Sequence, residues 1–233
     1  MILAIVQARC SSTRLPGKVL APVLGRAMIL RQLERLARTT EIDRLIVATS
    51  TDPSDDPLAE LLEAESVEVR RGSLRDVAAR FQQVAHEIKP DTIVRLTADC
   101  PLTDPAVVDR VIESHLNSGA DYTSNTINRT YPQGLDVECV RYDVFESLMR
   151  MPLTETEREH VTMGLYTRPE LFRLESVTQP VDHSRLRWTV DLPDDLEFVR
   201  TVYAALYDND PKFGQDEILE FLRVNPSLNR INE

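Results

Sequence analysis

The 233-residue chain is poor in cysteine, glycine and aromatic residues. It has 3 cysteines, 7 glycines and 6% aromatic residues, with no internal repeat or low-complexity tract, so collagen-like, solenoid and disordered architectures are excluded. Cys10, Cys100 and Cys139 are odd in number and widely spaced, which argues against a zinc site and for a reducing compartment. The length corresponds to about one and a half typical domains and is sufficient to bury a core without disulfides.

Long apolar segments are also lacking. No stretch approaches the roughly 18 apolar residues of a membrane-spanning helix. The apolar start, MILAIVQARC, lacks the basic region and the small-residue cleavage site of a signal peptide, and it predicts a strand instead. We therefore expect a cytoplasmic protein without a membrane partner.

Positive charge is scarce, since 27 Lys and Arg stand against 38 Asp and Glu, a net charge of −11. Such a chain repels a phosphate backbone, so we expect no nucleic-acid partner. Any small anion that binds must be met by a local basic cluster or by a metal ion.

Apolar runs of strand length alternate with helical patterns in the first half of the chain. Strands are predicted at 2–7, 44–48, 67–70 and 92–96, and helices at 28–38, 57–64, 74–87 and from 104–105 onward. Beyond about residue 120 the pattern predicts short strands at 136–140, 172–177 and 187–190, then helices at 194–207 and 215–224. This is typical of the α/β class, with an open, mostly parallel sheet and helices on both faces. We expect one domain over 1–233, in which 121–187 form a small, partly antiparallel extension that returns to the main sheet near Trp188.

The loop after the first strand concentrates positive charge. Arg9, Arg14 and Lys18 lie within ten residues, with three hydroxyl side chains at 11–13 between them. The loop matches neither GxGxxG nor GxxxxGK[ST], so it is neither a dinucleotide fingerprint nor a P-loop. Because ligands of parallel sheets bind outside the carboxyl ends of the strands, this cluster predicts a site for phosphates. The alternative is a solvated loop with scattered charges.

Two carboxylates follow predicted strands that are remote in sequence. Asp99 ends one strand and Asp191 ends a late one, so both can reach one crevice at the carboxyl edge. Oxygen ligands without His or Cys favour Mg²⁺. Alternatively, Asp99 caps a turn and Asp191 caps the following helix, although Asp194 and Asp195 fit a capping role better.

Seven segments match, in order, a family signature. They are ARCSSTRLPGK (8–18), VATSTDPSDDPL (47–58), RGSLRDVAARF (71–81), VRLTADCPLTDP (94–105), YPQGLDVE (131–138), REHVT (158–162) and WTVDLPDD (188–195). Over roughly residues 1–200 the chain resembles the cytidylyltransferases that activate acidic sugars. It is most similar to the spore-coat-polysaccharide type, which is related to the CMP-Kdo and CMP-sialate synthetases. The resemblance implies a glycosyltransferase-A-like nucleotidyltransferase fold and transfer of CMP from CTP to an acidic acceptor, with release of pyrophosphate.

The resemblance also implies roles for individual residues. The catalytic set is Arg9, Lys18, Asp99 and Asp191, of which the two aspartates would hold Mg²⁺. The nucleotide-binding set is Ala8, Arg9, Ser12, Arg14, Lys18, Thr49, Ser50, Arg71 and Asp76. Arg71 is the best candidate for the base, because a guanidinium donates to the cytosine O2 and N3 acceptors; its alternative is a surface arginine before a turn. Cys100 is expected to be a small buried residue rather than a nucleophile.

The acceptor is expected to bind the second half of the chain. The candidates are Asn125, Arg129, Tyr131, Gln133, Glu138, Arg158 and His160. Arg129 or Arg158 would bind an acceptor carboxylate with two hydrogen bonds, and His160 would bind an acceptor hydroxyl or act as a base. The alternative for both arginines is a surface salt bridge to Glu155, Glu157 or Glu159. Related synthetases pair through such an extension, so we expect a homodimer formed around 155–172.

Other functions remain open at this point. The acceptor of such an enzyme would be a sugar acid of the nonulosonate or octulosonate type, or else a phosphonate or polyol phosphate, since all of these suit arginine. A non-catalytic sugar-nucleotide-binding module is the alternative of another class, but Lys18, Asp99 and Asp191 are all present. A glycosyltransferase would need a DxD motif at the end of a central strand, and Asp99-Cys100-Pro101 is not one.

Overall fold

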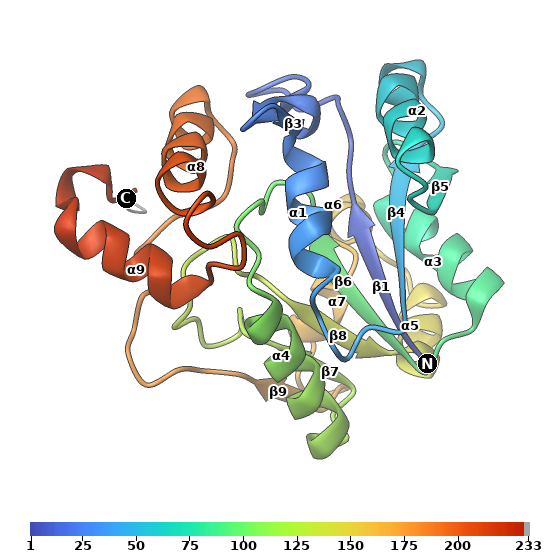
Figure 1. Ribbon diagram of the computed structural model, residues 1–233. Helices are drawn as coiled ribbons and strands as arrows, with labels where there is room; N and C mark the ends of the chain where they lie inside the picture. The colour runs from blue at the N-terminus through green and yellow to red at the C-terminus, as the bar shows by residue number, and fades with distance from the viewer. Residues whose placement is uncertain (231–233) are drawn as a thin grey trace.

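The computed structural model describes residues 1–230 and is built on one seven-stranded sheet (Figure 1). The strands of this sheet are β1 (Ile2–Gln7), β4 (Arg44–Ser50), β5 (Val69–Gly72), β6 (Thr92–Thr97), β7 (Tyr122–Ser124), β8 (Glu138–Arg141) and β9 (Leu174–Ser176). Their order is β5-β4-β1-β6-β8-β7-β9, and β8 is the strand of this sheet that runs against its neighbours. A small hairpin, β2 (Pro22–Val23) and β3 (Arg26–Ala27), stands apart. The predicted mostly parallel sheet is thus confirmed.

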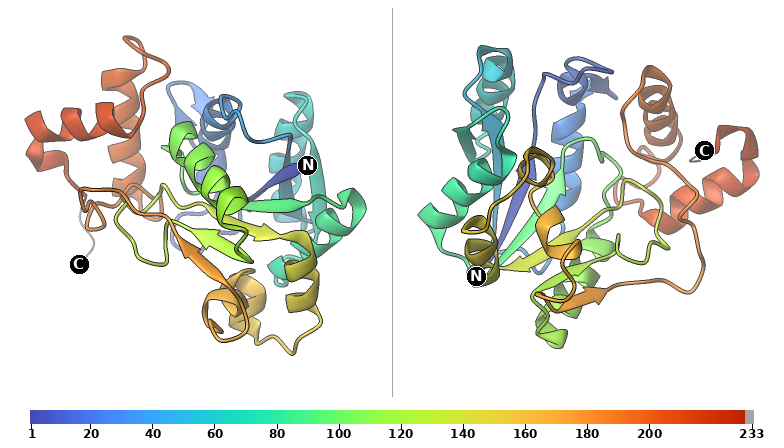
Figure 2. Two further views of the ribbon diagram at one scale, coloured as in Figure 1. Left: turned by 90° about the horizontal axis from the view of Figure 1, so that it is seen from below. Right: turned by 180° about the vertical axis from the view of Figure 1, so that it is seen from behind.

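Helices cover both faces of the sheet, as predicted (Figure 2). They are α1 (Met28–Leu36), α2 (Asp56–Ala64), α3 (Val77–Ile88), α4 (Pro105–Ser118), α5 (Tyr142–Met149), α6 (Glu155–Glu159), α7 (Met163–Tyr166), α8 (Pro193–Leu206) and α9 (Gln215–Val224). Because side chains alternate along a strand, β1 directs Leu3 and Ile5 toward α3, α5 and α7, and Ala4 and Val6 toward α1, α2, α4 and α8. Among residues 1–230, no helix is long and apolar enough to span a bilayer.

The extension is continuous with the main sheet rather than a separate layer. β8 pairs antiparallel with β6 on one side and with β7 on the other, so the extension lengthens the sheet beyond β6. The predicted strand at 187–190 is not a strand, because Arg187 makes only an isolated bridge with Gln133. Trp188 and Val190 are fully buried there, which explains the apolar pattern. The apolar pattern at 187–190 therefore reflects the burial of these residues and not their pairing in a sheet.

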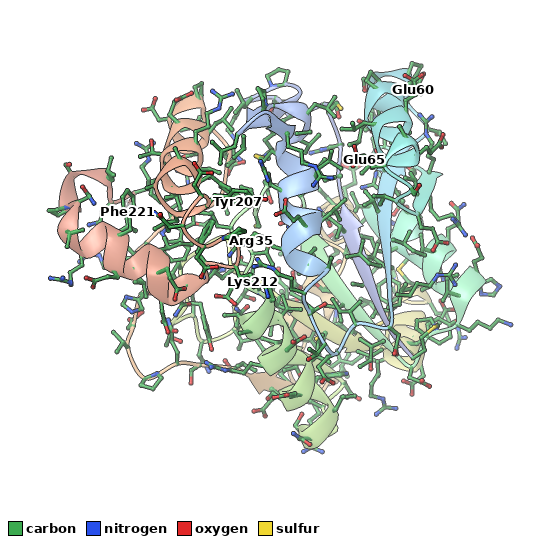
Figure 3. The ribbon with its side chains drawn as sticks, viewed as in Figure 1. Arg35, Glu60, Glu65, Tyr207, Lys212 and Phe221 are labelled. Atoms are coloured by element: carbon green, nitrogen blue, oxygen red, sulfur yellow. The ribbon has the colours of Figure 1, made fainter. Side chains whose placement is uncertain are left out.

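The C-terminal helices are fastened to the first half of the chain by buried polar contacts. Arg35 of α1 donates to the carbonyls of Thr103 (2.7 Å) and Phe213 (2.8 Å), and the Tyr207 hydroxyl donates to Glu34 (2.5 Å). Figure 3 shows Arg35 and Tyr207 in the layer between α1 and the C-terminal helices. These contacts fix α8 beside α1, and with it the segment that immediately precedes α8.

Candidate active site

A cavity of about 260 Å³ lies at the carboxyl ends of β1 and β6. This is the edge at which ligands of parallel sheets bind. Its lining comes from the loop after β1, the first turns of α3, the residues after β6, the end of α6 and the segment before α8. The lining residues are Gln7, Ala8, Arg9, Ser12, Thr13, Arg14, Lys18, Val19, Val77, Arg80, Thr97, Ala98, Asp99, Glu159, His160 and Asp191.

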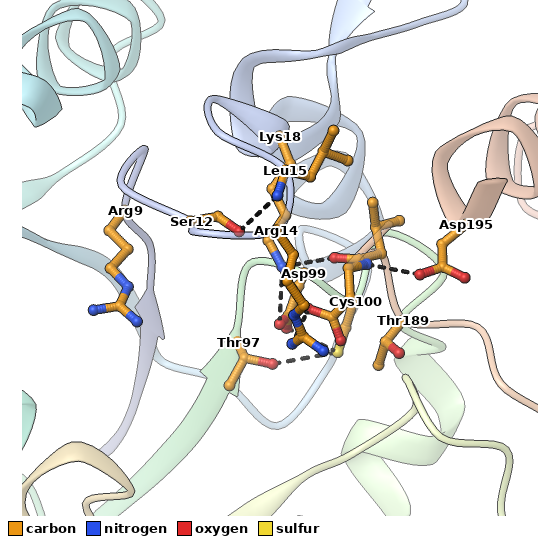
Figure 4. Close-up of polar contacts among 12 residues, drawn as sticks. Arg9, Ser12, Arg14, Leu15, Lys18, Thr97, Asp99, Cys100, Thr189 and Asp195 are labelled. Atoms are coloured by element: carbon orange, nitrogen blue, oxygen red, sulfur yellow. Dashed lines mark hydrogen bonds and ion pairs between the residues drawn. The ribbon is translucent and has the colours of Figure 1, made fainter. Parts of the chain in front are cut away.

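Lys18 contacts both predicted carboxylates in the lining of this cavity, and Figure 4 shows it beside Asp99. Its Nζ lies 3.0 Å from Asp191 Oδ1 and 3.4 Å from Asp99 Oδ2, and it donates to the Val190 carbonyl at 2.6 Å. The Lys18 side chain is only 9% exposed. The three groups predicted from separate motifs therefore meet at one point.

The segment that carries Asp191 is held by Asp195, the third residue of α8. Asp195 is buried and accepts the backbone N–H groups of Asp191 (2.9 Å) and Leu192 (2.8 Å), while Arg187 donates to it at 2.6 Å. Asp195 therefore caps α8, as expected, and the Asp191 side chain does not. Asp191 is left to face Lys18 and Arg14, whose Nη2 lies 2.8 Å from it.

Asp99 is ionised at neutral pH. Burial alone would raise the pKa of Asp99, but the charge of Lys18 and a hydrogen bond from Thr97 hold it below the ordinary value of 3.8. Burial and the neighbouring Asp99 raise the pKa of Cys100 well above its ordinary value. Cys100 is thus a buried, protonated thiol, which agrees with the packing role expected of it and disfavours a role as nucleophile or metal ligand.

The donor set at this point fits Mg²⁺. Asp99 and Asp191 offer carboxylate oxygens, which this ion prefers to nitrogen or sulfur. Within the described part of the chain, no three His, Cys, Asp or Glu side chains gather as a metal cluster. A cation held by two carboxylates keeps its other positions for water and phosphate oxygens, which is typical of Mg²⁺ at phosphoryl-transfer sites.

The predicted nucleotide-binding residues divide into two groups. Ala8, Arg9, Ser12, Arg14 and Lys18 line the cavity. The Arg9 guanidinium lies 3.5 Å from Glu159 across the cavity, and both side chains are substantially exposed. The first loop thus brings Lys18 and Arg14 to the predicted carboxylates, whereas Arg9 pairs with Glu159.

The other four residues of that set are not among the cavity lining. Thr49 and Ser50 are fully buried at the end of β4. Arg71 donates to the Ser50 carbonyl at 2.8 Å and pairs with Asp56 at 2.5 Å. Asp76 caps α3 by accepting the Ala79 N–H and pairs with Arg158 at 2.8 Å. Arg71 and Asp76 are therefore engaged with protein groups beside the cavity.

Of the predicted acceptor residues, His160 lines the cavity. Arg129 makes two hydrogen bonds to Asp136, at 2.5 and 2.8 Å, and Arg158 is paired with Asp76. Both arginines form salt bridges, but with these aspartates rather than with the glutamates at 155, 157 and 159.

The remaining acceptor candidates lie in the packed interior of the extension or at its edge. The Asn125 amide bonds the Leu135 carbonyl at 2.7 Å and the Val137 N–H at 2.9 Å. Glu138 is buried against Arg95, Tyr122 and Thr162. The Tyr131 hydroxyl accepts from Arg110 at 3.0 Å, and Gln133 bonds the 186–188 segment through its backbone. Each of these contacts holds the extension in shape.

Sequence reasoning did not select several lining residues, notably Gln7, Arg80 and Glu159. Gln7 is the last residue of β1, so its position at a strand end was a usable signal. Arg80 stands in the same motif as Arg71, and it is buried in the cavity wall. Glu159 stands in the REHVT motif beside His160.

A family model described as cytidylyltransferase matches residues 3–218 of this chain. The chain belongs to the cytidylyltransferase family. It is therefore an enzyme, a nucleotidyltransferase that depends on CTP, and the resemblance noted in the sequence is confirmed.

Relatives of this cytidylyltransferase extend over its full length. The spore coat polysaccharide biosynthesis protein SpsF of Bacillus subtilis (strain 168) is 34% identical over 97% of this chain and 95% of its own length. A 3-deoxy-manno-octulosonate cytidylyltransferase of Geobacter metallireducens is 37% identical over 48% of this chain and 43% of its own. The solved structure of a cytidylyltransferase from Leptospira borgpetersenii superposes with a TM-score of 0.93 at 29% identity, covering 100% of this chain and 98% of that one.

Proposed function

We propose that this enzyme transfers CMP from CTP to a small acidic acceptor and releases pyrophosphate, with Mg²⁺ as cofactor. The acceptor class we favour is a sugar acid of the nonulosonate or octulosonate type. The observation that carries the proposal is the contact of Lys18 with both Asp99 and Asp191, beneath a loop that supplies Arg9 and Arg14. Cations for a triphosphate and oxygen ligands for its metal ion thus lie in one cavity.

In the proposed reaction an acceptor oxygen attacks the α-phosphorus of CTP, and pyrophosphate leaves in line. Such a transfer depends on positioning and charge neutralisation more than on covalent catalysis. Arg9, Arg14 and Lys18 would bind the phosphate oxygens and stabilise the charge that accumulates on the leaving group. Asp99 and Asp191 would hold Mg²⁺, which when bound neutralises phosphate charge and orients oxygens.

The acceptor would enter beside Asp99, between His160 and the Arg129–Asp136 pair. His160 lines the cavity and is available to hydrogen-bond a hydroxyl. Arg129 is not among the residues that line the cavity and makes two hydrogen bonds to Asp136. An incoming carboxylate would then compete with Asp136 for Arg129, as it would with Asp76 for Arg158.

One relative is named for 3-deoxy-manno-octulosonate, which supports a sugar acid as the acceptor. A phosphonate or polyol phosphate would meet the same arginines and remains the competing acceptor class. The non-catalytic binding module is disfavoured, because the paired carboxylates and Lys18 are all in place. We also propose that two chains pair through residues 155–172.

The direct test is pyrophosphate release with Mg²⁺, each nucleoside triphosphate and a panel of sugar acids, phosphonates and polyol phosphates. We expect release with CTP and at least one sugar acid, and none from an Asp99→Asn variant. The exposed Asp208→Asn, between α8 and α9, is the matched control. Release with phosphonates alone would replace the acceptor class, and tight CTP binding without turnover on any acceptor would favour the binding module.

A further inference from the structure

Arg80 is a buried cation that forms no ion pair within 4 Å with a carboxylate of residues 1–230. It lies on α3, is 2% exposed and lines the cavity. Its Nη1 donates to the Ser73 carbonyl at 3.1 Å, while its Nε is buried without any hydrogen-bond partner among residues 1–230. By contrast, Arg9, Arg14 and Lys18 each form an ion pair within 4 Å.

A buried guanidinium with an unpartnered Nε favours a bound ligand that supplies hydrogen-bond acceptors. Burial, opposed in part by the negative charge of Asp55 and assisted by the positive charge of Arg9, lowers the pKa of Arg80 to about 10. A buried charge with unused donors is unfavourable unless it is hydrogen-bonded. In the wall of a nucleotide cavity, the bound nucleotide is the partner that can supply those acceptors.

The topology indicates which part of the nucleotide reaches Arg80. In the sheet order β5-β4-β1-β6, Asp99 follows β6 on one side of β1, whereas α3 follows β5 on the other side. If the α-phosphate lies at Asp99 and Asp191, a nucleotide that crosses the end of β1 brings its other end to α3. Ala8 and Val77 add apolar lining near that end, which suits a planar ring.

We propose that Arg80 reads the base, donating from its guanidinium to the O2 and N3 acceptors of cytosine. This inference rests on the proposed placement of the α-phosphate. Uracil carries an N–H at position 3, so Arg80 would face a donor there and lose one hydrogen bond. Arg71, which the motif favoured, already donates to Ser50 and Asp56. Arg80 would thus make the site prefer CTP to UTP.

The first experiment varies the ligand and leaves the wild-type chain unchanged. Binding of CTP, 3-deaza-CTP, UTP and zebularine triphosphate is measured by calorimetry with Mg²⁺ and no acceptor. 3-Deaza-CTP lacks the N3 acceptor, whereas zebularine triphosphate lacks only the 4-amino group. We expect 3-deaza-CTP and UTP to bind about ten- to a hundredfold more weakly than CTP, and zebularine triphosphate to keep most of the affinity.

The second experiment repeats these titrations with Arg80→Lys, and Arg75→Lys, at an exposed position in the loop before α3, is the control. A lysine keeps the charge but cannot donate to both acceptors in one plane. We therefore expect the preference for CTP over UTP and over 3-deaza-CTP to collapse in Arg80→Lys and to persist in Arg75→Lys.

Three outcomes would overturn the inference. Equal wild-type affinities for CTP and 3-deaza-CTP would remove the N3 contact. If Arg80→Lys weakens the binding of all nucleotides equally and keeps the preference for CTP, Arg80 binds phosphate or only supports the loop at Ser73. Collapse of the preference in Arg71→Lys but not in Arg80→Lys would assign the base to Arg71. No acceptor enters these titrations, so a wrong acceptor class would leave them unaffected and show only in the pyrophosphate assay.

Discussion

Replacing Lys18 by methionine tests the charge arrangement at the heart of the site. Methionine preserves the length and apolar stem of the side chain, so the change removes chiefly the ammonium group. Asp191 would keep Arg14 at 2.8 Å and Arg187 at 3.8 Å. Asp99 would lose the cation that holds its pKa down, and the Val190 carbonyl would lose a 2.6 Å hydrogen bond. The interactions lost without replacement are therefore those of Asp99 and of the Val190 carbonyl.

The expected loss of stability has two parts. An unpaired buried carbonyl costs about 1–3 kcal/mol. Breaking a fully buried ion pair costs about 3–5 kcal/mol, but the Asp99 side chain is 32% exposed, so solvent screening reduces this part to about 1–2 kcal/mol. We expect the free energy of unfolding to fall by about 2–5 kcal/mol at pH 7. With CTP, Mg²⁺ and the acceptor saturating, kcat should fall about 10²–10³-fold.

The two parts differ in their dependence on pH. In the wild type the folded pKa of Asp99 is lowered, so the pair stabilises the protein above about pH 4 and this contribution is lost as pH falls through the folded value. In Lys18→Met, burial raises the pKa of Asp99, so the penalty of the ionised carboxylate disappears as the pH falls through that raised value. The difference between the two proteins should therefore shrink from pH 7 toward pH 4, leaving the carbonyl part and what remains of the wild-type ion pair, which is lost only below pH 4.

Urea unfolding of wild type, Lys18→Met and Lys212→Met at pH 7, 5.5 and 4 measures this difference. Lys212 is exposed, so its variant removes the same charge without touching the site. A loss of stability in Lys18→Met that is the same at all three pH values would refute the role assigned to Asp99. A Lys18→Met enzyme with near wild-type turnover at saturating substrates would refute the catalytic role of Lys18.

Four further outcomes follow from the same geometry. Asp191→Asn should lower kcat about 10²–10³-fold while its melting temperature stays close to that of Asp208→Asn; normal turnover would contradict its role. CTP should bind at least tenfold more weakly in EDTA than in Mg²⁺, about 1.4 kcal/mol, and equal titrations would remove the metal from the site. Arg129→Ala or Arg158→Ala should raise the acceptor KM with the CTP KM unchanged. If neither variant changes the acceptor KM, the acceptor's anionic group binds elsewhere. Light scattering at micromolar concentration should show a dimer, and a clean 26.5 kDa species would exclude it.

The meeting of Lys18 and Asp99 was predictable because each follows a parallel strand of the sheet. A buried parallel strand is visible as an apolar run, and the rule that carboxyl ends share one edge then places the segments after β1 and β6 together. Asp191 follows a buried segment that is not a strand, so this rule does not place it. That rule needs no knowledge of side-chain contacts. The structure confirms the meeting of these three groups at 3.0 and 3.4 Å.

The choice between Arg71 and Arg80 was not predictable from local sequence. Both stand in one motif, nine positions apart, and both have the chemistry to read a base. Arg71 forms a salt bridge with Asp56, which lies on another element and contacts Arg71 only in the folded chain. The prediction of a strand at 187–190 was wrong for a related reason, because the burial of Trp188 and Val190 produces a strand-like pattern without a neighbouring strand.

The ion pairs of the cavity explain how a chain of charge −11 can accept a triphosphate. In the structure Lys18 and Arg14 are bound to Asp191, and Arg9 to Glu159. A nucleotide that arrived alone would draw these cations away and leave Asp99 and Asp191 facing further negative charge. Asp99 and Asp191 would hold a divalent cation, whose charge would remove that repulsion and leave Lys18 and Arg14 for the phosphates. CTP binding should therefore depend on the metal ion, which the titrations with EDTA and Mg²⁺ test, whereas Arg80 has no such ion pair to break before it meets the base.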